Sequence, residues 1–467
     1  MRFKKFGKAL LMGALSAGVV FGVTSCVESY TVGFLYVTGT ETASSGNNGI
    51  ISGYKIDHNT GKLAPINGLP VSSNGANPVR AVLVTGSRFL YVLNRGVNKE
   101  GNGDCTPSDP CLNSNITQFA VGGNGVLTFE ESFSTQGLNP FRLIGDSSGS
   151  YLMVLDHDAP SVAACQAALG SSITTCGDVT VFQINQTTGR LSVVENTAVT
   201  QANCPTNLFP CPLTYFPVPG NPVDFVLSGG AYLLTLSSSV VPTSYPYSGG
   251  SSVWPYSYTS SSGQLTITSN SSQTFGSMSQ GTAIISANSQ IYILDNEPIT
   301  TEYDCATGQP CTPTTYLSQI LPFSAAGAGG NLSALPGGII PDYQGLSDPI
   351  QLMIESKGTY MYVANQVNSQ SSGTNTPVSD IAAYFITTSP NFQTSFVTGQ
   401  PFGAGAGPQC IVEDPSDQFI YEANGIDSTV SGRILDPHSG ELDNMRVTST
   451  YTLPGPATWC LVDGRTG

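Results

Sequence analysis

Histidine is scarce in this 467-residue chain, and one of its three copies stands where it could transfer a proton. His157 lies between two carboxylates in the string Asp156-His157-Asp158, directly after a predicted strand. A neighbouring carboxylate can orient an imidazole, so His157 or Asp156 could act as a general base. The alternative is that His157 is a solvated loop residue. His58 and His438 fall in predicted hairpin turns, where a polar side chain needs no catalytic role.

A second set of polar residues recurs two positions after a proline, near the start of predicted inner strands. The set comprises Arg80, Arg142, Asp224, Gln351, Cys410 and Thr458. Arginine recognises carboxylates and phosphates through paired hydrogen bonds, so Arg80, Asp224 and Gln351 could bind an anionic or polyhydroxylated ligand. Arg142, and Arg80 beside it, could stabilise an oxyanion. The alternative is a set of structural salt bridges between neighbouring units, for instance between Arg142 and Asp224.

Other kinds of chemistry lack a sequence signature. The chain contains no G-x-S-x-G elbow, no H-x-x-x-H zinc motif, no P-loop and no D-x-D-x-D-G calcium spacing. We therefore expect neither a cofactor nor a metal, and calcium at Asp104, Asp109 or the pair Asp156 and Asp158 is the alternative. With 31 Asp and Glu against 16 Lys and Arg, the net charge of −15 would repel a polyanion, which excludes nucleic acid as a partner.

The N-terminus resembles an export signal. Arg2, Lys4, Lys5 and Lys8 precede the apolar stretch 9–23, which is too short to span a bilayer comfortably. Val23-Thr24-Ser25-Cys26 resembles a bacterial lipobox, so we expect a signal peptide at 1–25, acylation of Cys26 and a short linker at 26–33. The alternative is an ordinary secretory signal. We expect a periplasmic or cell-surface protein that touches the membrane only through its lipid anchor.

The cysteines support an oxidising compartment. Of 11 cysteines, ten remain once Cys26 is set aside, and their gaps do not suit a zinc site. We therefore predict five disulfides. They are Cys105–Cys111, Cys165–Cys176, Cys204–Cys211, Cys305–Cys311 and Cys410–Cys460.

Repeated strings define the elements that must position these residues. An aromatic or aliphatic pair, a Tyr or apolar residue and usually an aliphatic residue recur seven times, beginning at Phe34, Phe89, Tyr151, Tyr232, Gln290, Tyr360 and Phe419. A second string contains a Gly turn, as in Tyr54 to Leu63, and a third begins with Pro. Each repeat therefore predicts four strands, A from the Pro, B from the Tyr, C before the Gly turn and D after it.

Seven four-stranded repeats predict an all-β, seven-bladed β-propeller over residues 34–467. The low charged fraction of 10%, the 52 Gly and the 31 Pro fit an all-β chain. Residues 34–37 form a B strand without an A strand, and residues 457–462 form an A strand without a B strand. We expect the two to pair and close the ring, giving a monomer without an exposed edge. An array of Ig-like sandwiches is the alternative fold.

The long Cys-rich insertions are predicted to gather on one face. The order of strands places three of them in B–C loops and the one with Cys204 and Cys211 in a D–A loop. Propellers bind ligands at the channel mouth, so we expect a small molecule, a glycan or a protein at this loop-rich face. The alternative is that the disulfides only protect long loops against proteolysis.

The strings themselves resemble a known family. Phe89-Leu90-Tyr91-Val92-Leu93-Asn94, together with Ile-Asp-x-x-Thr-Gly-x-Leu, is similar to the lactonase-type seven-bladed propellers, which include bacterial 6-phosphogluconolactonase and carboxymuconate lactonizing enzymes. The resemblance implies opening or closing of lactones at a rim of Arg, His and acidic residues. The family's His and Glu motifs have no match here, and Arg80, Arg142 and His157 stand nearest by position.

Two functions remain open at this point. The first is an exported lactone hydrolase for a sugar-acid lactone, with His157 or Asp156 as general base. The second is a non-catalytic surface propeller that binds a glycan or protein, since a fold does not fix a function.

Overall fold

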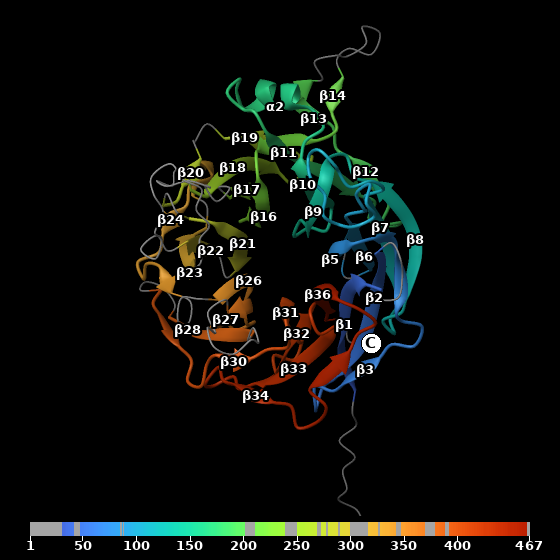
Figure 1. Cartoon of the computed structure of the whole chain (residues 1–467), viewed down its shortest axis with the longest axis vertical. Helices are drawn as coiled ribbons and strands as arrows, with labels where there is room; N and C mark the ends of the chain where they lie inside the picture. Colours follow the sequence, from blue (N-terminus) through green and yellow to red (C-terminus); the bar gives the residue numbers. More distant parts are fainter. Residues whose placement is uncertain are drawn as a thin grey trace, which may run out of the picture.

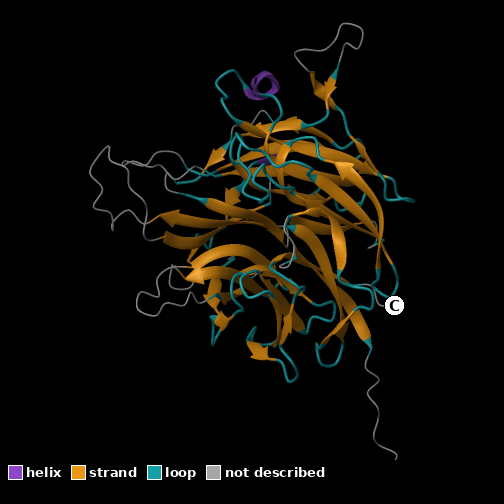
Figure 2. Ribbon diagram, turned by 45° about the vertical axis from the view of Figure 1, so that its right-hand side comes forward, coloured by secondary structure: helices purple, strands orange, loops and turns teal. Residues whose placement is uncertain are grey.

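The repeated strings fold into seven antiparallel sheets arranged around a central axis (Figure 1). The computed structural model describes residues 30–41, 47–84, 86, 88–200, 211–238, 250–268, 272–276, 279–287, 290–298, 316–325, 327–341, 347–368, 379–387 and 392–464. In this part of the chain nearly all regular structure is strand (Figure 2). The predicted seven-bladed propeller is confirmed.

The two inner strands of every blade follow the predicted strings. Blades are numbered from the one that begins at β5, and blade 7 combines β36 with β1. In this order the A strands are β5 (Pro78–Val84), β9 (Leu138–Gly145), β16 (Pro222–Ser228), β21 (Gly281–Ala287), β26 (Ser347–Ile354), β31 (Pro408–Glu413) and β36 (Ala457–Asp463). The B strands are β6 (Phe89–Asn94), β10 (Tyr151–Asp158), β17 (Tyr232–Ser237), β22 (Gln290–Pro298), β27 (Tyr360–Asn368), β32 (Phe419–Asn424) and β1 (Thr31–Thr40).

The outer strands complete each blade, and the D strand is split in all blades but the first. The C strands are β7 (Asn115–Val121), β11 (Cys176–Ile184), β18 (Ser252–Thr259), β23 (Tyr316–Ser324), β28 (Asp380–Ile386), β33 (Thr429–Leu435) and β2 (Asn48–Asp57). The D strands are β8 (Leu127–Ser134), β12 (Leu191–Val193) with β15 (Phe216–Pro219), β19 (Gln264–Ile267) with β20 (Gln273–Thr274), β24 (Ser333–Ala334) with β25 (Ile340–Pro341), β29 (Thr394–Phe396) with β30 (Phe402–Gly403), β34 (Leu442–Asn444) with β35 (Thr450–Thr452), and β3 (Leu63–Pro65) with β4 (Val71–Ala76).

The hydrophobic core lies in layers between adjacent blades. All six residues of β6 are buried because both of its faces are covered, whereas most of the outer strand β8 is exposed. In one such layer Tyr91 and Leu93 of blade 1 pack with Leu152 and Val154 of blade 2. The B strands therefore read as continuous apolar runs, which is why their strings stand out in the sequence.

The two ends of the chain share blade 7, as predicted. β1 pairs antiparallel with β36, with Leu35 opposite Val462 and Val37 opposite Cys460. Figure 1 shows the first and last strands side by side in this blade. The first described residue, Tyr30, stacks on His58 in the C–D hairpin turn, with ring centroids 4.5 Å apart. Both ends of β1 are thus fixed, and the ring closes without a free edge.

Tyrosine hydroxyls join consecutive blades. In four places the Tyr of a B string donates a hydrogen bond to the carbonyl of the Gly in the next blade's C–D turn. The pairs are Tyr36 with Gly125 at 2.8 Å, Tyr91 with Gly189, Tyr362 with Gly440 at 2.8 Å, and Tyr421 with Gly61 at 2.6 Å. Gly61 has φ +65, and a Cβ there would lie 2.4 Å from the Phe419 ring, so the turn requires glycine. The two strings repeat together because they contact each other.

The predicted disulfide Cys410–Cys460 links the inner strands of blades 6 and 7, with a Cα–Cα distance of 5.8 Å. Both cysteines are buried. Because blade 7 is assembled from the two ends of the chain, this bond lies where the ring depends on non-covalent pairing. A disulfide of this kind typically contributes about 2–4 kcal/mol.

The Cys-rich insertion of blade 2 lies at the outer edge rather than at the axis (Figure 1). Helix α2 (Val162–Leu169), which follows β10, carries Cys165 of the predicted Cys165–Cys176 disulfide. It packs on β13 (Asn196–Thr200) and β14 (Pro212–Leu213), a hairpin that interrupts the D strand, through a small cluster with Tyr215. No helix among the described residues is long and apolar enough to span a bilayer.

Candidate functional site

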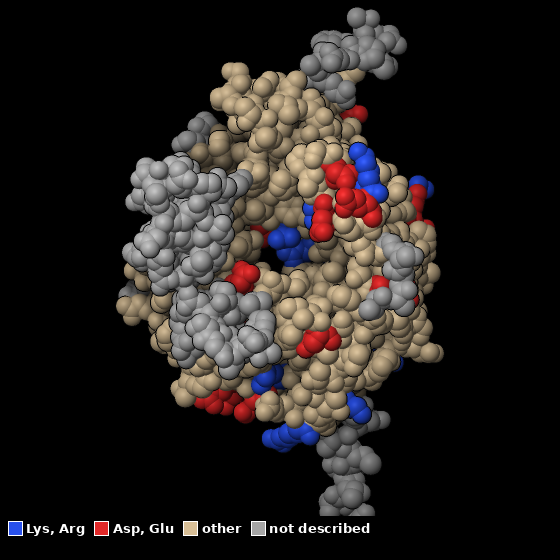
Figure 3. All heavy atoms as spheres, viewed as in Figure 1, with Lys and Arg blue, Asp and Glu red and all other residues tan. Residues whose placement is uncertain are grey.

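A cavity of ≈ 610 Å³ opens at the centre of the ring. Figure 3 shows the hollow from one face, with basic atoms gathered inside it. Its lining among the described residues is Val79, Arg95, Phe141, Arg142, His157, Pro222, Val223, Ser238, Gln280, Gly281, Thr282, Gln409 and Thr458. These residues lie at the starts of A strands and at or just after the ends of B strands. The cavity is therefore the channel mouth on the face of the B–C and D–A loops, as predicted.

Two equivalent positions of successive blades supply most of this lining. The first is a bulge near the start of each A strand: Pro78 pairs with Asn94 and Arg80 with Leu93, which leaves Val79 without a partner. A bulge turns the extra residue out of the ladder, here toward the axis. The equivalent residues in the lining are Val79, Phe141, Val223, Thr282, Gln409 and Thr458. The second position lies four residues after the third residue of a B string, at the end of the B strand. It supplies Arg95, His157 and Ser238.

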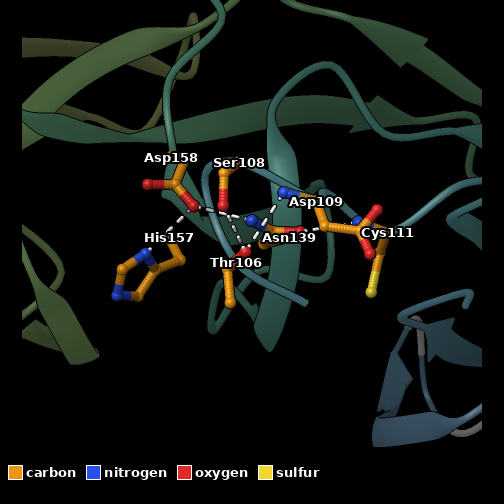
Figure 4. Close-up of polar contacts among 7 residues, drawn as sticks. All are labelled: Thr106, Ser108, Asp109, Cys111, Asn139, His157 and Asp158. Atoms are coloured by element: carbon orange, nitrogen blue, oxygen red, sulfur yellow. Dashed lines mark hydrogen bonds and ion pairs between the residues drawn. The ribbon is translucent and has the colours of Figure 1, made fainter. Parts of the chain in front are cut away.

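His157 is held at the cavity by the carboxylate of Asp158. Its Nδ1 lies 3.1 Å from Asp158 Oδ2, and the same oxygen accepts a hydrogen bond of 2.7 Å from Asn139 Nδ2. Burial alone would raise the pKa of Asp158, but the hydrogen bonds from His157 and Asn139, with the charges of His157 and Arg95, lower it. Figure 4 shows the imidazole pointing away from this polar cluster. The arrangement presents the far nitrogen, Nε2, for proton transfer.

Arg95 is the functional candidate that the sequence reasoning missed. It directly follows Asn94 at the end of β6, as His157 follows Asp156 in β10. Its buried Nε has no hydrogen-bond partner among the described residues. Burial lowers the pKa of Arg95, and Asp104, Arg142 and Asp158 modulate it. Alignment of the B strings would have found it, because Arg95 and His157 are four positions after the same string position.

Part of this architecture matches a known protein family. Residues 34–206 match the family model described as lactonase, 7-bladed beta-propeller. Over that segment the chain resembles the seven-bladed lactonase propellers. The resemblance predicted from the strand strings is confirmed, and no curated protein matches the sequence.

Solved structures share the fold of this propeller at low sequence identity. The periplasmic gluconolactonase PpgL of Pseudomonas aeruginosa is 17% identical, with a TM-score of 0.62 over 92% of this chain and 98% of that one. A protein of Bacteroides uniformis assigned as a 6-phosphogluconolactonase is 13% identical, with a TM-score of 0.60 over 92% of this chain and 99% of that one. Likeness at this level shows the fold.

The polar residues predicted for the rim divide between the cavity and the contacts between blades. Arg142 lines the cavity, but its Nε also lies 3.3 Å from Asp224 Oδ1, which is the salt bridge considered as the alternative. Asp224 Oδ2 accepts a hydrogen bond of 3.0 Å from the backbone N–H of Ile284 in the next blade. Gln351 Oε1 likewise accepts a hydrogen bond of 2.9 Å from the backbone N–H of Ile411 in the next blade. Asp224 and Gln351 therefore join inner strands.

Arg80 lies in the channel wall. Its guanidinium carbon is 3.5 Å from the centroid of the Trp459 ring, a cation–π contact across blades 1 and 7. Burial, and then repulsion by Arg142, lower the pKa of Arg80 to about 9. Attraction by the Asp224 carboxylate partly offsets this lowering. Thr458 occupies the bulge position and lines the cavity, so in blade 7 Trp459 is the equivalent of Arg80.

Asp156 needs a correction, because the structure turns it away from the cavity. It is fully buried and lies directly opposite Asp178 in the neighbouring strand β11. Burial raises the pKa of Asp156 to about 8 and that of Asp178 well above its ordinary value, and in Asp178 repulsion by Asp156 adds to the effect. A carboxyl without access to the cavity does not meet a substrate there. Asp158, not Asp156, is the acidic partner of His157.

The remaining predicted features concern cysteines and metals. Cys105–Cys111 forms as predicted and belongs to the B–C loop of blade 1, beside the site. The predicted pairs Cys204–Cys211 and Cys305–Cys311, and the lipidation residue Cys26, include residues outside the described part of the chain. Among the described residues, no three or more His, Cys, Asp or Glu side chains are placed to hold a metal ion.

Proposed function

We propose that this protein is an exported lactone hydrolase that acts on a sugar-acid lactone. The observation that carries the proposal is the His157–Asp158 pair at the cavity, with Arg95 and Arg142 in the same lining. A general base and cationic groups around one cavity are what acyl transfer to water requires. The lactonase-family match over residues 34–206 and the gluconolactonase described from Pseudomonas support this reaction class.

His157 transfers the protons in this reaction, and the arginines stabilise the negative charge. His157 Nε2 accepts a proton from water while the water oxygen bonds to the lactone carbonyl carbon. The electron pair of the carbonyl moves to its oxygen, and the guanidinium of Arg95 or Arg142 stabilises that negative charge. When the pair returns, the bond between the carbonyl carbon and the ring oxygen breaks. Protonated His157 gives its proton to the ring oxygen, which releases a hydroxy acid and restores the imidazole.

The charge of the cavity favours an anionic substrate. Among the described residues, the cavity lining contains two arginines, Arg95 and Arg142, and no carboxylate. This excess of positive charge contrasts with the net charge of −15 of the whole chain. An acidic sugar lactone would therefore be attracted to the channel mouth and away from the outer surface.

Hydrolysis is tested by base consumption at constant pH. We expect the purified protein to hydrolyse one or more sugar-acid lactones faster than buffer, with an acidic lactone preferred over neutral gluconolactone. Homoserine lactones and aryl esters complete the panel and define specificity. Base consumption at the spontaneous rate for every compound would contradict the proposal and favour a non-catalytic propeller that binds a glycan or protein.

We further propose that the chain is exported and anchored by a lipid on Cys26. The basic and apolar N-terminal pattern, the lipobox-like string and the disulfides support this. Metabolic labelling with a palmitate analogue is expected to mark the protein, and Cys26→Ser is expected to abolish the label. A mature chain that begins at another residue would defeat the claim.

A further inference from the structure

We propose that Asn139 is a positioning residue that fixes which nitrogen of His157 carries the proton. It would do so through Asp158, while the disulfide-closed loop 105–111 holds Asn139 itself. Only the kinetic part of this inference rests on the proposed function, because the state of the imidazole can be measured without any substrate.

The orientation of the Asn139 amide follows from a backbone donor. Asn139 is 1% exposed, and its Oδ1 accepts a hydrogen bond of 2.8 Å from the backbone N–H of Cys111. A backbone N–H can only donate, so the atom that faces it must be the amide oxygen. The NH₂ group must then face Asp158, whose Oδ2 lies 2.7 Å away.

The position of the proton on the His157 imidazole follows from its carboxylate partner. An ionised carboxylate is an acceptor only, and the lowered pKa of Asp158 keeps it ionised near neutral pH. Since His157 Nδ1 lies 3.1 Å from that carboxylate, Nδ1 must carry the proton. In the neutral ring Nε2 then has the lone pair and can accept a proton. Without this contact, a neutral histidine in water favours the opposite tautomer, with the proton on Nε2.

The loop that supplies the Cys111 donor is built to hold its shape. Cys105 and Cys111 are joined by the disulfide, and between them Thr106 and Asp109 exchange backbone hydrogen bonds of 3.0 and 3.1 Å. The Thr106 hydroxyl also accepts from the Asp109 N–H at 3.1 Å. Figure 4 shows this turn next to Asn139 and Asp158. The Cys-rich insertion of blade 1 thus contacts Asn139 of blade 2, which contacts the carboxylate that holds His157.

Equivalent residues in neighbouring blades separate the backbone role of Asn139 from that of its side chain. Asn77, Asn139 and Asn221 each precede the proline of an A strand, with φ of 51, 58 and 53, a left-handed conformation that asparagine tolerates. The Asn77 amide donates to the carbonyl of Gly96 at 2.7 Å. The Asn221 side chain makes no hydrogen bond within the described part of the chain. Of these three, Asn139 alone contacts a carboxylate that holds a histidine.

The experiment compares Asn139→Gly with Asn221→Gly. Glycine accepts a positive φ, so each variant keeps its backbone and loses only the amide. The readout is the ¹⁵N chemical shift of the imidazole nitrogens at a pH where the ring is neutral. The chain has three histidines, so His58 and His438 act as internal references and His157→Gln assigns the third signal.

We expect His157 to show the Nδ1–H tautomer in the wild-type protein and in Asn221→Gly, and a mixture or the Nε2–H form in Asn139→Gly. With an active lactone, kcat of Asn139→Gly should fall about 10- to 100-fold, the usual effect of losing a residue that orients a functional imidazole, while KM changes little.

Two results would overturn the inference. One is an unchanged Nδ1–H tautomer of His157 in Asn139→Gly. The other is an equal change in Asn139→Gly and Asn221→Gly. If the tautomer shifts as expected but no lactone is hydrolysed, the positioning role stands and the proposed function fails.

Discussion

Replacing His157 by glutamine is expected to lower kcat for lactone hydrolysis by about 10²- to 10⁴-fold, the usual contribution of a positioned general base. Glutamine can still contact Asp158, but it cannot take a proton from water. Because the imidazole is held by Asp158 and presents Nε2, the loss should appear in kcat and leave KM nearly unchanged. Initial rates on the best substrate of the lactone panel measure the effect.

The matched control is His438→Gln. That histidine occupies a hairpin turn, with a side chain 93% exposed and a carboxylate neighbour, Asp436, at 3.7 Å. It therefore shares with His157 an adjacent acid but not the cavity. Wild-type rates in His157→Gln would place the base elsewhere, and an equal loss in both variants would point to damage to the fold.

The free energy of unfolding is expected to fall as the pH rises from about 4 to about 8, because of the buried pair Asp156 and Asp178. Burial, and for Asp178 the repulsion by Asp156, raise both pKa values, that of Asp156 to about 8. The folded protein thus keeps protons that the unfolded chain releases near pH 4. The contribution of the pair is complete below that pH and is lost progressively until the folded pKa is reached.

Asp178→Asn isolates this effect. The substitution leaves a carboxyl opposite an amide, the arrangement that Asp380 and Asn365 adopt at the equivalent place in blade 5, with a 2.7 Å hydrogen bond. We expect the variant to lose less stability than the wild type between pH 5 and pH 8, measured by guanidinium unfolding at each pH. Asp443→Asn, on an exposed strand, is the control. Parallel curves for the wild type and Asp178→Asn would contradict the raised pKa values of the buried pair.

The sequence predicts the blades well because packing fixes their residues. The buried Tyr of a B string and the Gly of a C–D turn are constrained together, because the two hydrogen-bond across four pairs of neighbouring blades in the described part of the chain, as Tyr421 and Gly61 do. The orphan strands at the two ends and the Cys410–Cys460 bond follow from the same count of repeats. The A strand of blade 4 is the exception, since it starts at Gly281 without a proline.

The candidate site is harder to predict because it depends on which way each side chain points rather than on the type of residue. The bulge between Pro78 and Arg80 moves the cavity-facing position by one residue, so Val79 faces the cavity and Arg80 lies against Trp459. Alternation along β10 likewise sends Asp156 into the blade. No residue in these strings marks the shift in register. Only the ladder itself shows which side chains reach the axis.

The course of β1 sets the direction in which the cavity would face in a cell. Tyr30 stacks on a hairpin turn at one face of the ring, and β1 then runs ten residues, about 30 Å, to the face that carries the channel mouth. Tyr30 lies at the face of the ring remote from His157, and if Cys26 is acylated as proposed, the lipid joins the chain only four residues before it. The bilayer would then lie behind the ring, and the cavity would open toward the aqueous phase, where a dissolved lactone can enter it freely.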